Sequence, residues 1–406
     1  MPVVDGMAFD AMAQFTAVAG DLRDPYPDLV DRRRDEPVQG TLTASFIEGL
    51  EEMSYIVHRY DDVVAVLRDN VTYSSSAIRE LMAPVMGDYV LVGMDEPEHK
   101  RLRALVSVAF RQRSLAAWEP FAQFVVDGYL DRIIGKHGRE RGSAELVREL
   151  TFPYPIQVIA RILGVPAEDT AKFHEWAWWI INVAADPGKG IPASEAMKAY
   201  LADVLDRRRA DPGDDVISEL VHAELDGEQL GDEEIFSFIR LLLPAGAETT
   251  YRATGNFLYG LLTNPDQLAA LRDDRSLMTQ AVEEAIRWES PLLITSRNAT
   301  VDSEVAGTLI PAGHQVVAHV GSANHDETRW ERPEVFDIFR EQKPHAAFGF
   351  GPHMCLGMHL ARMEMRVAVG AVLDRMPDVR LDPAAEDVHI HGERFRSPTS
   401  LPVLFG

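Results

Sequence analysis

The only cysteine among the 406 residues, Cys355, lies in a loop whose composition suits a metal ligand. Gly349 and Gly351 come shortly before it and permit backbone conformations that are closed to other residues. An apolar helix is expected to begin directly after it, over residues 356–375, so Cys355 should lie at a helix N-terminus. Unpaired N–H groups at such an end stabilise a sulfur anion and lower the pKa of a thiol. We interpret Cys355 as a thiolate that binds a metal.

Two other interpretations of Cys355 stay open on this segment alone. A single cysteine often behaves as a small buried hydrophobic residue. His353, two residues earlier, could instead activate the thiol as a nucleophile, although the sequence offers no evident group to orient that histidine.

A second segment places an acid and an alcohol inside an apolar helix. Residues 241–250 read Leu-Leu-Leu-Pro-Ala-Gly-Ala-Glu-Thr-Thr, and Glu248 and Thr249 are costly to bury there without partners. Gly246 weakens a helix, and Pro244 removes a donor and frees the carbonyl of Arg240. These features predict a local bulge with room for a small polar ligand. A kinked core helix without a ligand explains the segment equally well.

Helical patterns dominate the rest of the chain, and strands are few. Helices are expected over residues 60–68, 97–110, 115–134, 154–163, 193–209, 232–262, 276–288 and 356–375. Residues 54–58 read as a strand, residues 304–310 and 314–320 as a hairpin, and residues 388–391 and 401–405 as a second small sheet. No repeat or linker is evident. We predict a mainly α protein with small β-sheets, forming a single large domain over residues 1–406.

Charge and composition exclude several classes of protein. The net charge is 40 − 64 = −24, which argues against a general nucleic-acid binder. A single cysteine excludes an internal disulfide and any multi-cysteine metal cluster. The most apolar stretch, residues 176–185, is too short to span a bilayer, and the first residues lack a signal-peptide pattern. We therefore expect no membrane anchor and a cytoplasmic location.

The ten residues from Phe348 to Gly357 resemble the haem-binding loop of the cytochrome P450 family in residue types and spacing. The resemblance extends over about residues 24–405 and is greatest to the soluble bacterial members. It implies the cytochrome P450 fold and a haem b (iron protoporphyrin IX) cofactor. It also implies that Cys355 is the axial thiolate ligand of the haem iron, with Phe348 and Gly357 among the residues that bind the cofactor.

The segment from Ala245 to Thr249 resembles the oxygen-activation motif of the same family. By that resemblance, Ala245 and Gly246 line the O₂ groove. Glu248 and Thr249 then relay protons to dioxygen at the iron, with the glutamate moving between solvent and the site. Pro244 departs from the aliphatic residue that the family carries at its position.

Two further sets of residues resemble family motifs. Glu284 and Arg287, three apart on one helix face, would otherwise be a solvated surface pair, but the resemblance implies a buried triad with Arg340. Donors to the two haem propionates are implied as well, although each alone would more often be a surface charge or a satisfied histidine. These are His99, Arg103, Arg297 and His353. His325 stands where many relatives carry arginine.

The resemblance implies a haem-thiolate monooxygenase that inserts one oxygen atom of O₂ into an apolar small organic substrate. The alternatives are a peroxide-driven peroxygenase of the same fold and a non-catalytic haem sensor. With no reductase domain expected in the chain, electrons should come from a ferredoxin and its reductase, which Arg362 and Arg366 could meet. A monomer is expected. The resemblance places substrate-facing segments at residues 73–89, 176–186, 241–245, 292–295 and 394–396. Three tryptophans in the second segment are nevertheless expected in the core, namely Trp176, Trp178 and Trp179.

Overall fold

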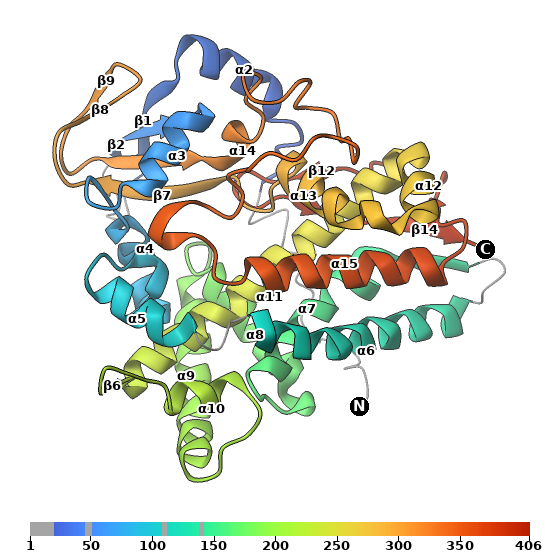
Figure 1. The fold of residues 1–406 in the computed structure, drawn as a ribbon, viewed down its shortest axis with the longest axis horizontal. Helices are drawn as coiled ribbons and strands as arrows, with labels where there is room; N and C mark the ends of the chain where they lie inside the picture. Colours follow the sequence, from blue (N-terminus) through green and yellow to red (C-terminus); the bar gives the residue numbers. More distant parts are fainter. Residues whose placement is uncertain (1–19, 45–50, 108–111, 138–141) are drawn as a thin grey trace.

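A five-stranded sheet lies at one side of the molecule, and a group of long helices forms the other side (Figure 1). The computed structural model describes residues 20–44, 51–107, 112–137 and 142–406. The strand order is β1-β2-β10-β7-β3, in which only β2 and β10 run parallel. The sheet therefore joins an N-terminal hairpin to a segment more than 200 residues later in the chain. Its strands are β1 (Val38–Ala44), β2 (Glu51–Val57), β3 (Tyr73–Ser74), β7 (Ile294–Ala299) and β10 (Gln315–His319).

The helices supply most of the ordered structure. The longer ones are α6 (Gln112–His137), α7 (Pro153–Ile162), α8 (Thr170–Ile181), α9 (Pro187–Ala210), α11 (Asp232–Thr263), α13 (Met278–Trp288) and α15 (Met358–Arg375). The shorter ones are α2 (Tyr26–Asp35), α3 (Tyr60–Arg68), α4 (Ser76–Met86), α5 (Glu98–Val106), α10 (Val216–Val221), α12 (Pro265–Asp273) and α14 (Val320–Ala323). None of the described helices combines the length and the apolar character that crossing a membrane requires.

The predicted helices are present within the described residues, and residues 108–110 of the helix predicted over 97–110 lie outside them. Two strand predictions were wrong. Residues 304–310 do not form one strand, because Ala306 and Gly307 have positive φ and make a tight turn between β8 (Ser303–Val305) and β9 (Thr308–Ile310). β10 pairs instead with β2 and β7. The strands predicted over residues 388–391 and 401–405 do not form one sheet but join different sheets. β12 (Ile390–His391) pairs with β13 (Ser397–Pro398), and β14 (Pro402–Phe405) lies between β11 (Arg380–Leu381) and β4 (Gly142–Glu145). A further small hairpin joins β5 (Glu224–Leu225) to β6 (Glu228–Gln229).

Helix α11 runs through the centre of the helical group and contacts α7, α8, α13 and α15. It is a continuous α-helix from Asp232 to Thr263, so the predicted bulge near Pro244 is not seen. Packing on several sides outweighs the one lost donor of Pro244 and the weak propensity of Gly246. The Thr249 hydroxyl donates to the Ala245 carbonyl at 2.9 Å, a bond that α-helical geometry accommodates.

A buried charge network joins α13 to the segment that leads to the cysteine loop. Both carboxylate oxygens of Glu284 accept from Arg287, at 2.7 and 2.8 Å, and one also accepts from Arg340 at 3.2 Å. Arg287 also donates to the carbonyls of Asn324 and Pro333. The predicted triad is therefore assembled in the structure, and its hydrogen bonds to backbone carbonyls fix the chain between Asn324 and Arg340.

Glu364 on α15 is a buried acid without a matching base. It is 1% exposed, and its Oε2 has no hydrogen-bond partner among the described residues. Burial raises the pKa of Glu364 well above its usual value. The neutral carboxylic acid is therefore the form that this position favours.

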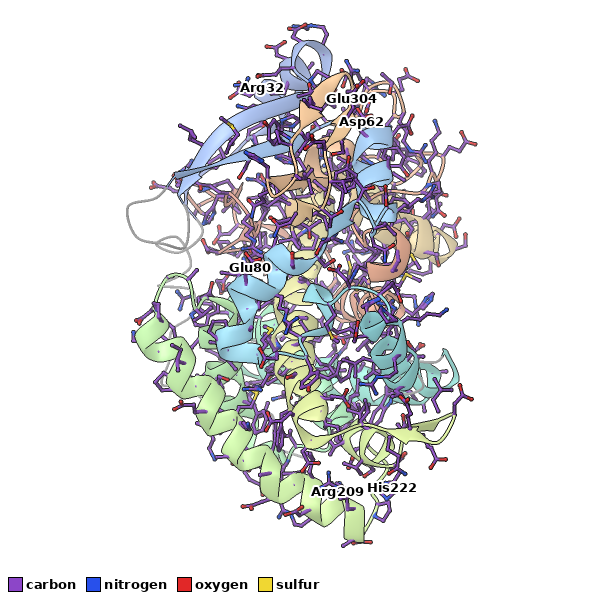
Figure 2. All side chains as sticks on the ribbon, turned by 90° about the vertical axis from the view of Figure 1, so that its left-hand side faces the viewer. Arg32, Asp62, Glu80, Arg209, His222 and Glu304 are labelled. Atoms are coloured by element: carbon purple, nitrogen blue, oxygen red, sulfur yellow. The ribbon has the colours of Figure 1, made fainter. Side chains whose placement is uncertain are left out.

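Replacing Glu284 with glutamine should destabilise the fold. The change leaves the buried guanidinium of Arg287 without its countercharge, so the free energy of unfolding at pH 7 should fall by about 3 kcal/mol or more. Chemical denaturation followed by circular dichroism measures this loss. Glu304→Gln is the control, since Glu304 is exposed on β8 (Figure 2) and its loss should change stability by less than about 0.5 kcal/mol. Equal stabilities for the two variants would contradict the structural role of the triad.

Glu364→Gln should flatten the dependence of stability on pH. The folded-state pKa of Glu364 lies above the unfolded value of about 4.3, so folded protein holds a proton that the unfolded chain releases. Stability is therefore lost as pH rises above about 4.3, by at most about 1.4 kcal/mol per pH unit. The glutamine variant should lose less stability between pH 5 and 8 in denaturation experiments. The exposed Glu386→Gln should behave as the parent does, and a parallel curve for Glu364→Gln would refute the burial argument.

Candidate functional site

The cysteine loop is held against helix α3 by a close backbone contact. Gly351 has φ +71°, and a Cβ there would lie 2.8 Å from the Leu67 carbonyl oxygen and 2.9 Å from the Arg68 Cα. Only glycine satisfies both the conformation and the space. The loop closes on itself because the Cys355 N–H donates to the Phe348 carbonyl at 2.8 Å.

The Cys355 thiol differs from the prediction in two ways. Helix α15 begins at Met358, three residues after Cys355 rather than directly after it. Burial raises the pKa of the thiol, although the Gly357 N–H donates to it and the charges of Arg103 and Arg362 act in the opposite direction. The predicted lowering is therefore wrong for the protein without a metal, because desolvation outweighs these donors. A bound metal ion would itself supply the charge that keeps the sulfur ionised.

Cys355 lies in a recess rather than on an open face. The residue is accessible to solvent, yet protein surrounds it closely enough for desolvation to dominate its pKa. A sulfur atom in such a position can reach a ligand that enters the recess. This arrangement does not fit the alternative of a cysteine packed as a small core residue.

The centre of helix α11 is open on one side. Ala245 is exposed and Gly246 and Thr249 are half-buried, whereas Ala247 and Thr250 are buried. Residues 245 and 249 are four apart and share one helix face. That face is the one the sequence assigned to O₂, and its small side chains leave room for a ligand.

Glu248 points away from that face. Its Oε2 accepts from Arg252 Nη2 at 3.1 Å, and both side chains are 2% exposed. Oε1 is buried and has no hydrogen-bond partner within the described residues. Burial raises the pKa of Glu248, and the charge of Arg252 opposes this shift. Glu248 and Thr249 are thus neighbours in sequence, but they make no direct hydrogen bond here.

Two of the predicted propionate ligands are histidines whose rings are in contact, tilted by 36°. The rings of His99 and His353 lie 4.0 Å apart, and His353 Nε2 contacts Ser75 Oγ at 3.0 Å. His99 Nδ1 lies 3.3 Å from a Glu96 oxygen, but its buried Nε2 has no partner in the described parts of the chain. Burial lowers the pKa of both rings, that of His353 to about 3. Each ring is therefore neutral, and in His99 the single N–H lies on Nδ1, toward the Glu96 carboxylate.

The two predicted arginines complete this donor set. Arg103 Nη2 donates to the Met354 carbonyl at 2.5 Å, which places its charge beside the cysteine loop. Arg297 on β7 is 3% exposed, and its Nη1 donates to the Ser296 carbonyl at 2.8 Å. Burial lowers the pKa of Arg297 to about 10, and Arg297 has no ion-pair partner among the described residues. A buried guanidinium without a carboxylate suits an anionic ligand.

Four of the five predicted substrate-facing segments are neighbours. Helix α4 contacts both α11 and β7, and the Leu293 N–H donates to the Arg394 carbonyl at 2.9 Å. The fifth segment, residues 176–186, begins within helix α8, which also packs on α11. Trp178 and Trp179 are buried in the core, as predicted, whereas Trp176 is only partly buried against it.

Arg362 and Arg366 are already paired within the chain. Arg362 donates twice to Glu283, at 2.5 and 2.8 Å, and its guanidinium lies 4.4 Å from the centre of the Phe348 ring. Arg366 donates to Glu119 at 2.6 Å. Both arginines line a cleft of about 260 Å³ between α6, α13 and α15. They are therefore not free charges, although they remain partly exposed.

Sequence reasoning missed two polar partners of the site. Arg252 follows Glu248 by four residues, and this spacing in an otherwise apolar helix was a usable signal for the buried pair. Ser75 has no comparable signal, since its contact with His353 joins residues 278 positions apart.

The residues present fit a haem. The recessed Cys355 thiol offers a single soft ligand, and the open face at Ala245 and Thr249 leaves room beside it. The buried guanidinium of Arg297 offers donors for a carboxylate, and the unpartnered His99 Nε2 can take up a proton toward one. This set combines one metal ligand with several anion donors, which is what an iron porphyrin with two propionates requires.

Comparison with known proteins supports the same conclusion. Residues 188–384 match the family model described as Cytochrome P450. Cytochrome P450 107B1 of Saccharopolyspora erythraea is 36% identical over 401 residues, which cover 95% of this chain and 94% of that protein. Nocardicin C N-oxygenase of Nocardia uniformis subsp. tsuyamanensis is 39% identical, with 87% and 90% covered. The solved structure of the Bacillus subtilis bacillaene polyketide synthase cytochrome P450 PksS has a TM-score of 0.86 at 31% identity, with 94% and 97% covered. The chain therefore belongs to the cytochrome P450 family of haem-thiolate monooxygenases.

Proposed function

We propose that this protein uses haem b, bound through Cys355, to insert one oxygen atom of O₂ into an apolar small organic substrate. The observation that carries the proposal is the recessed Cys355 thiol within a loop that only glycine at position 351 permits. The open face of α11 at Ala245 and Thr249 supports O₂ chemistry over simple haem storage.

The haem iron would supply oxygen activation, to which an axial thiolate contributes electron density. The protein would hold the sulfur through the Gly357 N–H and the nearby charges of Arg103 and Arg362. Phe348, whose carbonyl accepts from the Cys355 N–H, fixes the direction of the loop. These contacts orient the thiolate and limit its access to water.

The propionates would be bound by four donors from different parts of the chain. A propionate beside His99 Nε2 would favour protonation of that nitrogen, because the N–H of the neutral ring lies on Nδ1 toward Glu96, and Arg103 and Arg297 would donate from their guanidinium groups. His353 is held by its contacts with Ser75 and His99. Carboxylates at these positions would remove the cost of burying Arg297 unpaired.

Protons would reach the O₂ site through Thr249 and Glu248. Thr249 Oγ1 donates to the Ala245 carbonyl, so turning this hydroxyl away from the helix would let it donate to a ligand on the open face. Glu248 can hold a proton on Oε1, because burial raises its pKa and that oxygen has no acceptor or donor nearby among the described residues. Delivery requires the carboxyl group to rotate away from Arg252.

The substrate would be a mostly apolar molecule held between α4, α11, β7 and the loop at Arg394–Arg396. Relatives are named for nocardicin C and for polyketide biosynthesis, and these different chemistries agree in one respect, namely that the substrate is a small organic molecule. A ferredoxin and its reductase would supply the electrons near the cleft lined by Arg362 and Arg366.

The central prediction concerns the axial ligand. Reduced protein with carbon monoxide should show the strongly red-shifted Soret band of a thiolate-bound haem, and Cys355→Ala should lose it because no other cysteine can replace the ligand. Absorption spectroscopy after supply of haemin measures both. A red-shifted band that survives in Cys355→Ala would overturn the assignment.

Thr249→Ala should uncouple electron consumption from product formation. Without the hydroxyl, protons are delivered less selectively, and product per reducing equivalent should fall by about tenfold or more while reduced oxygen species accumulate. Thr263→Ala is a matched control, since Thr263 makes the same kind of bond to a carbonyl four residues earlier on α11. A peroxide-driven enzyme would work equally well with alanine at position 249. Unchanged coupling would therefore favour that alternative or the sensor.

Arg366→Gln should slow reduction by a ferredoxin. Removing this partly exposed charge weakens attraction to an acidic partner, so the reduction rate should fall by about threefold at low ionic strength and depend less on salt. Stopped-flow reduction measures the rate. Arg34→Gln is the control because Arg34 is also paired with acids but lies on α2. Identical salt dependence in both variants would move the docking surface elsewhere.

A further inference from the structure

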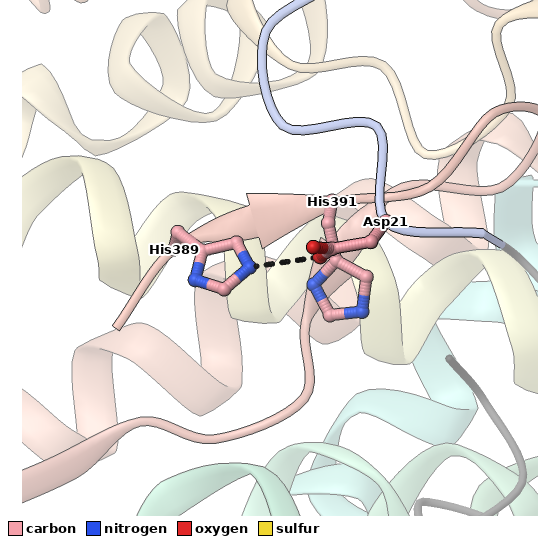
Figure 3. Close-up of side chains that lie close together, drawn as sticks. All are labelled: Asp21, His389 and His391. Carbon is pink, nitrogen blue, oxygen red and sulfur yellow. Dashed lines mark hydrogen bonds and ion pairs between the residues drawn. The ribbon is translucent and has the colours of Figure 1, made fainter. Parts of the chain in front are cut away.

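Two histidines and an aspartate meet at the surface far from the cysteine loop in sequence. Asp21 belongs to the N-terminal segment, His389 directly precedes β12, and His391 lies within it (Figure 3). Each offers one ligand atom, and the three atoms lie within 4.8 Å of one another. Residues 389 and 391 are two apart in an extended segment, which directs both rings to the same side.

The hydrogen bonds of His389 leave one ring nitrogen directed at Asp21. Nδ1 lies 2.6 Å from the Asp387 carbonyl oxygen, which can only accept, so Nδ1 carries the proton. Nε2 lies 3.4 Å from Asp21 Oδ1. A proton on Nε2, which makes an ion pair, or a metal ion between the two atoms would satisfy this arrangement. Metal-bound histidines commonly donate their other nitrogen to a carbonyl in this way.

The distance between these two atoms suits a tetrahedral metal ion. Two ligands at about 2.05 Å from Zn²⁺ lie about 3.3 Å apart. The 3.4 Å between His389 Nε2 and Asp21 Oδ1 is close to that value. With all three atoms within 4.8 Å, a shift of about 1 Å brings the His391 ring into the same coordination sphere.

The His391 ring is positioned to act as a ligand. The residue is 2% exposed, and its ring centre lies 5.0 Å from that of His389, so the surrounding protein holds the two rings beside each other. Asp21 is 54% exposed, which leaves a coordination position open to water.

The surrounding charges leave room for a cation. Arg23 lies 3.5 Å from Asp21, but its guanidinium makes a bidentate pair with Asp387, at 2.5 and 2.8 Å. Arg396 is paired with Glu289. Of these two arginines, Arg23 is thus the one whose charge is not taken up by another acid. Leaving His389 aside, the negative charges of Asp21 and Asp387 exceed the positive charge of Arg23 by one.

We propose that Asp21, His389 and His391 form a binding site for Zn²⁺ or a similar borderline divalent ion, with water as the fourth ligand. The site lies outside the haem machinery and would fasten the N-terminal segment to the C-terminal hairpin. Arg396 already joins these segments by donating to the carbonyls of Leu22 and Arg23, at 2.7 and 2.6 Å. Mixed nitrogen and oxygen ligands favour Zn²⁺, Ni²⁺ or Co²⁺ over Mg²⁺.

Isothermal titration calorimetry of the haem-loaded protein with ZnCl₂, in a buffer that does not chelate, tests this proposal. One Zn²⁺ should bind per chain, and an excess of Mg²⁺ should not compete. Asp21→Ala and His389→Ala should each weaken binding at least tenfold. Zn²⁺ should also raise the melting temperature of the parent protein and not that of these variants.

His222→Ala is the control, because His222 lies at the opposite end of the molecule from Glu304 and outside the three-residue cluster (Figure 2). It should bind Zn²⁺ as the parent does. The haem spectrum reports folding in every variant, and Asp21 is exposed enough for its removal to leave the fold intact. Absence of one-to-one binding, or equal affinity in His389→Ala and the parent, would overturn the proposal and leave a protonated His389 paired with Asp21.

Discussion

The site depends on holding one thiol in a recess where its charged form is unfavourable. Desolvation raises the pKa of Cys355, and the one N–H and two arginine charges nearby do not reverse this shift. The loop that imposes this position is itself constrained, since at Gly351 the backbone passes within contact distance of Leu67 and Arg68. Much of the surrounding fold serves to keep this loop in place.

Buried charge holds that loop from the other side. Glu284 and Arg287 fix the chain around Asn324 and Pro333, and the Asn324 side chain in turn accepts from the Ala346 N–H at 2.6 Å, directly before the cysteine loop. A hydrophobic replacement of such a network can be equally stable in general. Here the arginines donate to backbone carbonyls of an irregular segment, which apolar side chains could not satisfy. The network therefore specifies one conformation of a stretch that has no regular secondary structure.

The sequence allowed the helices and the residue types of the site to be predicted, but not the partners that lie far along the chain. Apolar periodicity located α3 and α11 to within a residue, because each buries a continuous stripe. The hairpin around Pro311 was misplaced because Gly307 could be read as part of a strand, whereas its positive φ makes it a turn. The pairing of β14 with β4, and the contact of Ser75 with His353, depend on tertiary packing that no local pattern encodes.

The dependence on residues far apart in the chain also explains why the pKa of Cys355 was predicted wrongly. Spacing showed that Cys355 would have N–H donors and that Glu248 would lie in an apolar helix, but the size of the desolvation depends on the whole surrounding fold. In the structure, burial shifts Cys355, Glu248, His353 and Arg297 toward their neutral forms. A buried group that disfavours its charged form can carry that charge when a bound ligand supplies the opposite charge. The iron porphyrin that we propose would do so twice, since its metal would offset the thiolate and its carboxylates would offset Arg103 and Arg297. The recess is thus better matched in charge to the cofactor than to water, and this match, more than any single contact, connects the fold to its chemistry.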